Sequence, residues 1–475
     1  MVIQELSNDN DAKVITTLPS GSVTSLEVLG TALSNIAPAV TAGITISLVA
    51  AVAGTATAMV YVIVGILMLI LAAQIATLSY YAPSAGGMYS YVSKTLHPYF
   101  GFLIAVTALL IVPFSVGTVP LLAGNFFVSG VDSLLDIRIA PWCGAAASLI
   151  ITLIAWFLSR KGVIISTKYG LISELISILA FLFIGIMVII QHDQFDRLQF
   201  STSLGSISVI GPAFIFAIFS YGGFESAGNL ALESRNKRKI APLMMLVSVL
   251  FSILFFTFLS YVIILGFNNN TTLLASTVSP FNYIGNKIGT PWIGPVTDFA
   301  MALALFSGSI AAVNTVSRTL YSMGVHKILP NSFAHIHAVH RTPSFATNIA
   351  LLIMLPVTVL VIVAHLSLLS IMGAVEGVTS LTMSIAYLFC SIAVPVILWR
   401  KRIIGFAFLL NIVLTVFIII PVLCFIFYKT VIPLPKGPAG YFMLLFAIVI
   451  LVSSLIYIGG RKSSYIERIS SGFGQ

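Results

Sequence analysis

Twelve apolar stretches alternate with short polar segments along the chain. A transmembrane helix needs about 20 consecutive, mostly apolar residues, and these runs lack the period-2 alternation typical of barrel strands. The pattern therefore predicts an all-α polytopic membrane protein with 12 transmembrane helices. We expect them near Leu26–Ala53, Ala58–Tyr81, Tyr99–Phe127, Ile139–Leu158, Ile164–Ile190, Ile207–Leu232, Leu243–Phe267, Ile293–Met323, Ser344–Ala364, Leu368–Leu398, Ile403–Tyr428 and Ala439–Ile458.

The composition excludes a soluble enzyme. Of the 475 residues, 59% are hydrophobic and only 8% are charged, whereas a soluble domain carries about 25% charged residues. The three cysteines, Cys143, Cys390 and Cys424, show no CxxC spacing, which argues against a disulfide framework or a metal site. We expect no cofactor.

The positive charges predict an orientation. If the N-terminus is inside, 18 of the 23 Lys and Arg residues fall on the cytoplasmic side of the twelve spans. Such a bias is typical of the positive-inside rule, so we expect a multi-pass protein of the cytoplasmic membrane with both termini inside. The same rule accounts for the net charge of +9 without a nucleic-acid partner.

Two of the predicted helices contain residues that interrupt helical structure. Span one carries Pro38 within Ser34–Gly43, and span six carries Gly222 and Gly223 within Phe219–Glu225. Proline removes a backbone donor and glycine lowers the cost of leaving helical geometry. These features can be simple packing kinks. Alternatively, they are discontinuous helices whose freed backbone groups line a cavity.

The positions of the two interruptions favour the second interpretation. They fall in the first members of two successive five-helix sets, and an odd number of spans inverts the second copy. We therefore expect a 5+5 inverted repeat with helices 1 and 6 discontinuous. The predicted boundaries are 1–25 for the N-terminal tail, 26–190 and 207–398 for the repeats, 403–458 for two C-terminal helices and 459–475 for the C-terminal tail.

Three motifs resemble the amino acid–polyamine–organocation superfamily. They are PSAGGMYSY at Pro83–Tyr91, FSYGGFESAG followed by Glu233 and Pro242, and the SRTLYSM…RTP run at Ser317–Pro343. The resemblance implies a LeuT-type fold with alternating access around a midplane site. In span one, Pro38 stands where many amino-acid members carry a Gly-Ser-Gly-like stretch, which is similar to the amine and polyamine branches.

The resemblance and the interruptions together indicate a substrate site. Phe219 aligns with the aromatic residue that covers the substrate in this family, so it is also the expected gate. The other expected substrate-binding residues belong to spans one, six and ten: Ser34, Asn35, Ala37, Pro38, Ala39, Ser220, Gly222, Gly223 and Thr379.

Two intramembrane acids are candidates for proton coupling or for binding a cationic substrate, because such acids are rare and costly in a bilayer. Glu225 begins the second half of span six, where it can also cap freed amides, and Glu376 lies among apolar residues of span ten. LeuT-type symporters hold sodium between span-one carbonyls and span-eight hydroxyls. Ser307 and Ser309 offer such hydroxyls, although small residues there also favour close helix packing.

The sequence thus predicts a secondary transporter for amino acids, coupled to protons. An amine or polyamine substrate, sodium coupling and an exchange mode stay open as alternatives. No HExxH or GxSxG motif points to an enzyme, and two broken helices in one chain do not suit a channel. The expected partners are a small-molecule substrate, a proton or sodium ion and the lipid bilayer, with the protein a monomer or weak homodimer.

Overall fold

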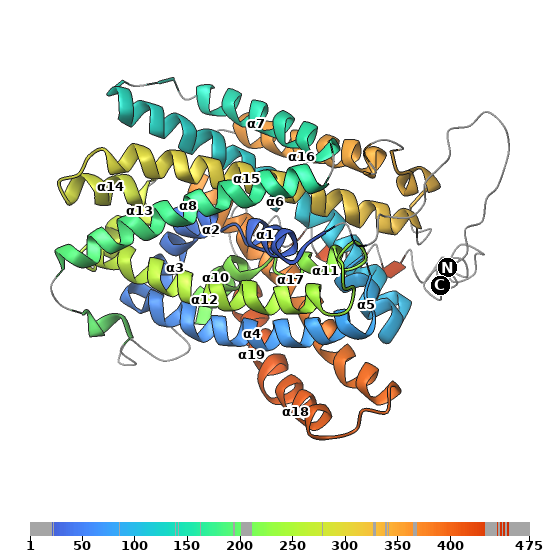
Figure 1. Cartoon of the computed structure of the whole chain (residues 1–475). Coiled ribbons are helices and arrows are strands. Elements are labelled where there is room, and N and C mark those ends of the chain that lie inside the picture. The colour runs from blue at the N-terminus through green and yellow to red at the C-terminus, as the bar shows by residue number, and fades with distance from the viewer. Residues whose placement is uncertain are drawn as a thin grey trace, which may run out of the picture.

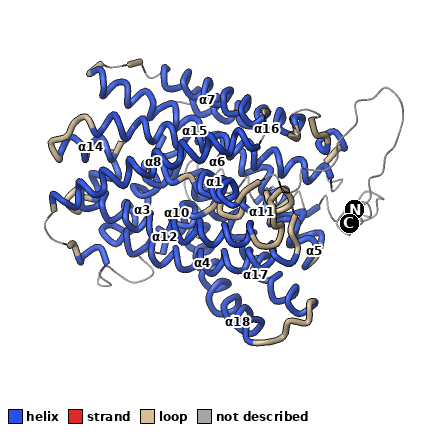
Figure 2. The backbone as a smooth tube through the Cα atoms, viewed as in Figure 1, coloured by secondary structure: helices blue, strands red, loops and turns tan. Residues whose placement is uncertain are grey.

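A computed structural model describes residues 21–432, apart from gaps at 22, 85, 138, 141, 162, 193–194, 201–210, 278, 326–328, 338–339, 341 and 364–367, and scattered residues between 444 and 455. These residues are helical almost throughout (Figure 2). Their β structure is limited to isolated bridge residues, including a parallel bridge between Val23 and Ser234.

The first half of the chain forms one interrupted helix and four long ones. The interrupted helix comprises α1 (Ser25–Ile36), α2 (Pro38–Val40), the π-helical segment η1 (Thr41–Thr45) and α3 (Ile46–Ala53). The elements that follow are η2 (Gly54–Ala56), α4 (Thr57–Tyr81), the short α5 (Met88–Thr95), α6 (Pro98–Leu135), α7 (Trp142–Arg160), α8 (Val163–Gln191) and η3 (Arg197–Phe200).

The second half again starts with an interrupted helix, built from η5 (Gly211–Ala213), α10 (Phe214–Tyr221) and α11 (Ser226–Asn229). The remaining elements are α12 (Ile240–Gly266), α13 (Thr271–Ser276), α14 (Pro280–Lys287), α15 (Ile293–Val325), η6 (Asn331–Ala334), α16 (Ser344–Val363), α17 (Leu368–Arg400), α18 (Phe406–Leu414), η7 (Thr415–Ile419) and α19 (Ile420–Val431).

Eight helical stretches of the described chain are long and apolar enough to cross a membrane, as expected of a polytopic membrane protein. The first of these, Ser25–Tyr81, spans 57 residues and contains two of the predicted stretches. Described helices occupy the first eleven predicted stretches. The twelfth, near Ala439–Ile458, lies largely outside the described residues, as do both predicted tails.

The long helices run side by side, with α13 and α14 at one end and α5 toward the other (Figure 1). The helix α15 packs against α1, α6, α7, α8 and α16, and 78% of its most apolar window is buried. By contrast, only 28% of the corresponding window of α7 is buried. Its exposed apolar side chains, such as Trp142 and Phe157, are therefore available to lipid.

Candidate functional site

The interruption in span one follows from two residues. The helix α1 starts at a capping box, in which Thr24 and Glu27 satisfy each other's backbone amides. It ends at Ile36 because Ala37 adopts a left-handed conformation, with φ of +52°. Pro38 then begins the next helical piece, where its missing N–H costs nothing. The turn therefore falls one residue before the proline.

The interruption in span six depends on its paired glycines. The helix α10 ends at Tyr221, Gly222 is extended, and Gly223 has a φ of +109° that L side chains rarely adopt. A Cβ atom on Gly223 would lie 2.5 Å from the carbonyl carbon of Asn35. The two interruptions therefore lie directly against each other, backbone to backbone, where only glycine fits.

A cavity of about 200 Å³ opens beside this contact. Segments far apart in the sequence contribute to its wall: both interruptions, the region around α5, and the helices α6, α15, α16 and α17. Most of the wall is apolar, with a few convergent polar groups, which is typical of small-molecule sites. Glu225 is the one charged side chain among the described residues of the wall.

The structure brings eight of the expected site residues to the cavity wall: Ser34, Asn35, Ala37, Phe219, Gly222, Gly223, Glu225 and Thr379. The other expected residues lie behind the wall. Pro38 and Ala39 are buried in the resumed helix. Ser220 is hydrogen-bonded to the Tyr61 hydroxyl, with 3.1 Å between the oxygens.

Two polar pairs join α1 to α15 beside the cavity. The Ser34 and Ser307 hydroxyl oxygens lie 2.9 Å apart, and Thr315 Oγ1 donates to Asn35 Oδ1 over 2.9 Å. The other candidate for sodium, Ser309, donates to the Leu305 carbonyl within its own helix, over 2.8 Å. The first half of span one is thus tied to span eight by side-chain hydrogen bonds.

The Glu225 carboxylate both caps backbone and lines the cavity. Its Oε2 accepts from the Gly223 amide over 3.0 Å and from the Tyr387 hydroxyl over 3.3 Å. The first contact satisfies an amide that the break in span six has freed, and the second links the break to α17. Because one carboxylate oxygen serves both contacts, the group also retains acceptor capacity for a ligand.

Glu376 lies away from the cavity, fully buried in α17. Its Oε1 accepts a hydrogen bond of 2.9 Å from the Thr45 hydroxyl in the π-helical segment of span one. Among the described residues, no cluster of three or more His, Cys, Asp or Glu side chains is arranged to hold a metal ion.

Several wall residues were not expected from the sequence. Tyr89 and Asn229 line the cavity toward the α5 end, although both stand in or beside the quoted motifs. The Tyr89 hydroxyl donates to Ser322 Oγ over 2.6 Å, and a Cβ atom on Gly87 would lie 2.5 Å from Asn229 Oδ1. The motif after span two therefore packs against spans six and eight at this end of the cavity.

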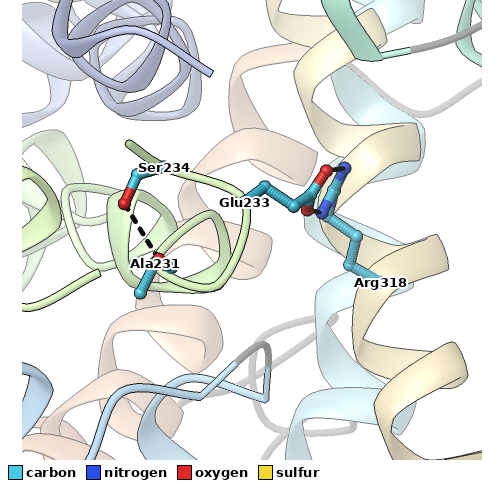
Figure 3. A network of polar contacts seen from close by, with 4 residues as sticks. All are labelled: Ala231, Glu233, Ser234 and Arg318. Atoms are coloured by element: carbon cyan, nitrogen blue, oxygen red, sulfur yellow. Dashed lines mark hydrogen bonds and ion pairs between the residues drawn. The ribbon is translucent and has the colours of Figure 1, made fainter. Parts of the chain in front are cut away.

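A buried ion pair also holds this end together. Arg318 of α15 pairs with Glu233, which follows α11 (Figure 3). The second terminal nitrogen of Arg318, Nη2, lies 3.2 Å from Glu233 Oε2. The neighbouring Ser234 is bridged to Val23 just before α1. The segments preceding span one and following span six are thus joined to each other and to span eight.

Comparison with known proteins gives a consistent assignment. The family model described as "Amino acid permease" matches residues 25–453. The chain is similar to the serine/threonine exchanger SteT of Bacillus subtilis (strain 168), with 26% identity over 61% of this chain and 66% of the relative.

The names of two further relatives state other substrates. The low-affinity putrescine importer PlaP of Escherichia coli (strain K12) is 27% identical over 57% of this chain and 59% of the relative. The branched-chain amino acid permease BcaP of Bacillus subtilis (strain 168) is 21% identical over 63% of this chain and 66% of the relative. The matches thus span between 59% and 66% of these relatives' lengths.

These proteins are permeases and not enzymes. The apolar helices of the described chain, together with this family, make the protein a multi-pass membrane protein. The superfamily expected from the three sequence motifs is confirmed. The chain belongs to the amino acid permease family, within the amino acid–polyamine–organocation superfamily.

Proposed function

We propose that the protein is a secondary active transporter that carries an amino acid across the cytoplasmic membrane by alternating access. One observation carries the proposal: the interruptions of spans one and six meet at a single cavity, with Gly223 against the backbone of Asn35. Non-helical backbone at membrane depth is tolerated where it lines a cavity, and discontinuous helices form the substrate sites of many transporters.

The geometry of the cavity suits a zwitterion. The C-terminal end of α1 and the N-terminal end of the helix resumed at Pro38 both border it. Carbonyl groups at a helix C-terminus attract an ammonium group, and amides at an N-terminus attract a carboxylate. In this proposal Phe219 covers the bound solute, while Ser34, Asn35 and Thr379 contribute polar contacts from the wall.

We further propose the arrangement expected from the sequence: 12 transmembrane helices in a LeuT-type fold, with inverted repeats at 26–190 and 207–398, and both termini inside. Under this orientation the α5 end of the cavity, with Tyr89 and Asn229, faces the cytoplasm. The Glu233–Arg318 pair and the Val23–Ser234 bridge then close the cytoplasmic end of the bundle. Rocking of spans one and six against span eight would have to break these contacts.

For the driving ion we propose a proton, with Glu225 as one group that links protonation to substrate binding. Its carboxylate faces the cavity and holds the amide of Gly223. Loss of its charge would weaken that hydrogen bond, because charge-assisted bonds are about twice as strong as neutral ones. A sodium ion near Ser34, Ser307 and Ser309 is the alternative.

An amine or polyamine is the second candidate substrate. The observation that favours it is the charge of the cavity wall, because Glu225 is its one charged side chain among the described residues. A carboxylate can bind a substrate ammonium group directly, and one of the relatives is a putrescine importer.

Counterflow in proteoliposomes tests the proposal. Vesicles loaded with unlabelled serine should take up labelled serine transiently above equilibrium, and this uptake should saturate. Alanine, arginine and putrescine added outside as competitors then separate amino-acid from amine specificity. If none of these four compounds stimulates uptake from inside or inhibits it from outside, the proposed substrate class is wrong.

A further inference from the structure

Four buried polar side chains cluster between span ten and the second half of span one. Glu376 and Thr379 belong to α17, and Thr41 and Thr45 belong to η1. None of the four is more than 2% exposed. Thr45 and Glu376 are joined by the hydrogen bond of 2.9 Å described above. We call these four residues the Glu376 cluster.

The sequence spacing places Thr379 and Thr41 on the same helix faces as Glu376 and Thr45. Thr379 lies three residues after Glu376, so both occupy one face of α17. Thr41 lies one turn before Thr45 in a segment whose hydrogen bonding is π-helical. Such π-helical turns are frequent at functional sites. The contact between η1 and α17 thus brings one carboxyl and three hydroxyl groups to the same part of the protein interior.

Much of the hydrogen-bonding capacity of the Glu376 cluster is unused. Glu376 Oε2, Thr41 Oγ1 and Thr379 Oγ1 have no hydrogen-bond partner among the described residues. The one ion pair found in the described part of the chain is Arg318–Glu233, so Glu376 lacks a cationic side chain. A buried carboxylate without a counter-charge is costly, and a bound cation removes that cost.

The titratable groups around α17 supply no such cation. The helix α4 presents Tyr61, whose hydroxyl pairs with Ser220, and α10 presents Tyr221, whose hydroxyl donates to the Tyr61 carbonyl. The segments η1 and α18–η7 contain no titratable side chain. The other titratable residues on the elements packed against α17 are Tyr80, Tyr81, Tyr89, Tyr91, Lys94, Tyr99, Asp132, Cys424, Tyr428 and Lys429. Within the described residues, none of them forms an ion pair with Glu376.

We propose that the Glu376 cluster is the binding site of a small monovalent cation, a proton or a sodium ion, whose movement is coupled to that of the solute. Carboxylate and hydroxyl oxygens suit such a hard cation. A proton would bind directly to the carboxylate, and a sodium ion would use the unpartnered oxygens as ligands. The proposal rests on the transport function proposed above and adds a cation site to it.

The position of the Glu376 cluster provides a route for coupling. Thr379 also lines the cavity, as does Val40, which directly precedes Thr41. The cation would therefore lie one layer of side chains behind the solute and bind the same two helical segments. A ligand that holds these segments in one arrangement favours a second ligand that needs the same arrangement. The Ser307 region differs, because it joins span one to α15.

The test uses purified full-length protein in proteoliposomes, with labelled serine as the probe. Accumulation is measured under an inward pH gradient without sodium, and separately under an inward sodium gradient at equal pH. For one-to-one coupling, a tenfold gradient supports up to about tenfold accumulation. We expect wild type to respond to one of the two gradients, which identifies the ion. Glu376→Gln should abolish that response while counterflow exchange continues.

Two controls make the result specific. Glu174→Gln removes another buried carboxylate, in α8. Glu174 is 2% exposed, and its two carboxylate oxygens also lack hydrogen-bond partners among the described residues. Thr382→Val removes a hydroxyl on α17 that donates to the Val378 carbonyl within its own helix. Both variants should keep the gradient response. If Glu376→Gln does not fold, Thr45→Val replaces it, because it removes the hydroxyl that donates to Glu376 without touching the cavity wall, and it should shift the cation concentration needed for half-maximal accumulation.

Three results would overturn the cation site. One is gradient-driven accumulation in Glu376→Gln, or in its replacement Thr45→Val, that equals wild type. Another is wild-type exchange that neither gradient affects. The third is loss of the gradient response in Glu174→Gln with retention in Glu376→Gln, which would move the site to span five. Absence of counterflow in wild type would instead contradict the proposed transport of serine.

Discussion

Replacement of Gly223 by alanine tests the contact between the two interrupted helices. The added Cβ would lie 2.5 Å and 2.6 Å from the Asn35 carbonyl carbon and oxygen, and 2.8 Å from the Ile36 nitrogen. All three are backbone atoms, so no flexible side chain can move aside. The residue would also have to keep a φ of +109°, which is strained for any L side chain.

The two effects have comparable magnitudes. An unfavourable backbone conformation costs about 1–3 kcal/mol, and overpacking a tightly filled position costs about another 1–3 kcal/mol. Gly54→Ala separates them, because Gly54 also has a positive φ, of +59°, but nothing within 4 Å of a Cβ atom. Gly377→Ala, in α17, has neither problem and serves as the neutral control.

The assay combines thermal unfolding in detergent with counterflow exchange. We expect Gly223→Ala to lose clearly more stability than Gly54→Ala, or else to displace α1 and lose exchange. Gly377→Ala should resemble wild type in both measurements. If Gly223→Ala and Gly54→Ala behave alike, the breaks of spans one and six do not pack against each other.

Three further predictions concern the cavity and the ion pair at its α5 end. Phe219→Ala should raise the substrate KM sharply, because it uncovers the cavity; unchanged uptake kinetics would remove Phe219 from the site. Glu225→Gln should flatten the pH dependence of uptake, whereas Tyr387→Phe should retain it, and an unaltered profile in Glu225→Gln would leave only the capping role. Arg318→Gln leaves Glu233 buried without its counter-charge and should cost about 3–5 kcal/mol of stability. The double variant with Glu233→Gln should recover much of that loss in thermal unfolding, and equal losses in the single and double variants would contradict this.

The sequence predicts the interruptions well because local chemistry determines them. Proline cannot continue the hydrogen-bonding pattern of α1, and the paired glycines tolerate the conformations found after α10. The exact position of the turn is harder to predict from the sequence, because Ala37, and not Pro38, adopts the left-handed conformation. That choice depends on how the chain packs at the break, and single-residue propensities do not contain this information.

Which residues reach the cavity could be predicted only in part. A helix face is determined by its neighbours, so sequence alone does not reveal that Thr379 reaches the wall while Glu376 contacts Thr45 behind it. Tyr89 comes from α5, outside the interrupted helices, and Asn229 is the last residue of α11, one position beyond the quoted motif. The motifs containing or adjoining them were the available signal, but motifs alone do not say which side chains point inward.

The decisive measurement is the experimentally determined structure of the protein with bound substrate, using the compound that counterflow identifies. We predict density for the solute between Ala37 and Gly223, beneath Phe219, with α1 and α10 ending where they do here. A solute bound elsewhere, or spans one and six continuing as unbroken helices past these residues, would contradict a substrate site formed by the two breaks.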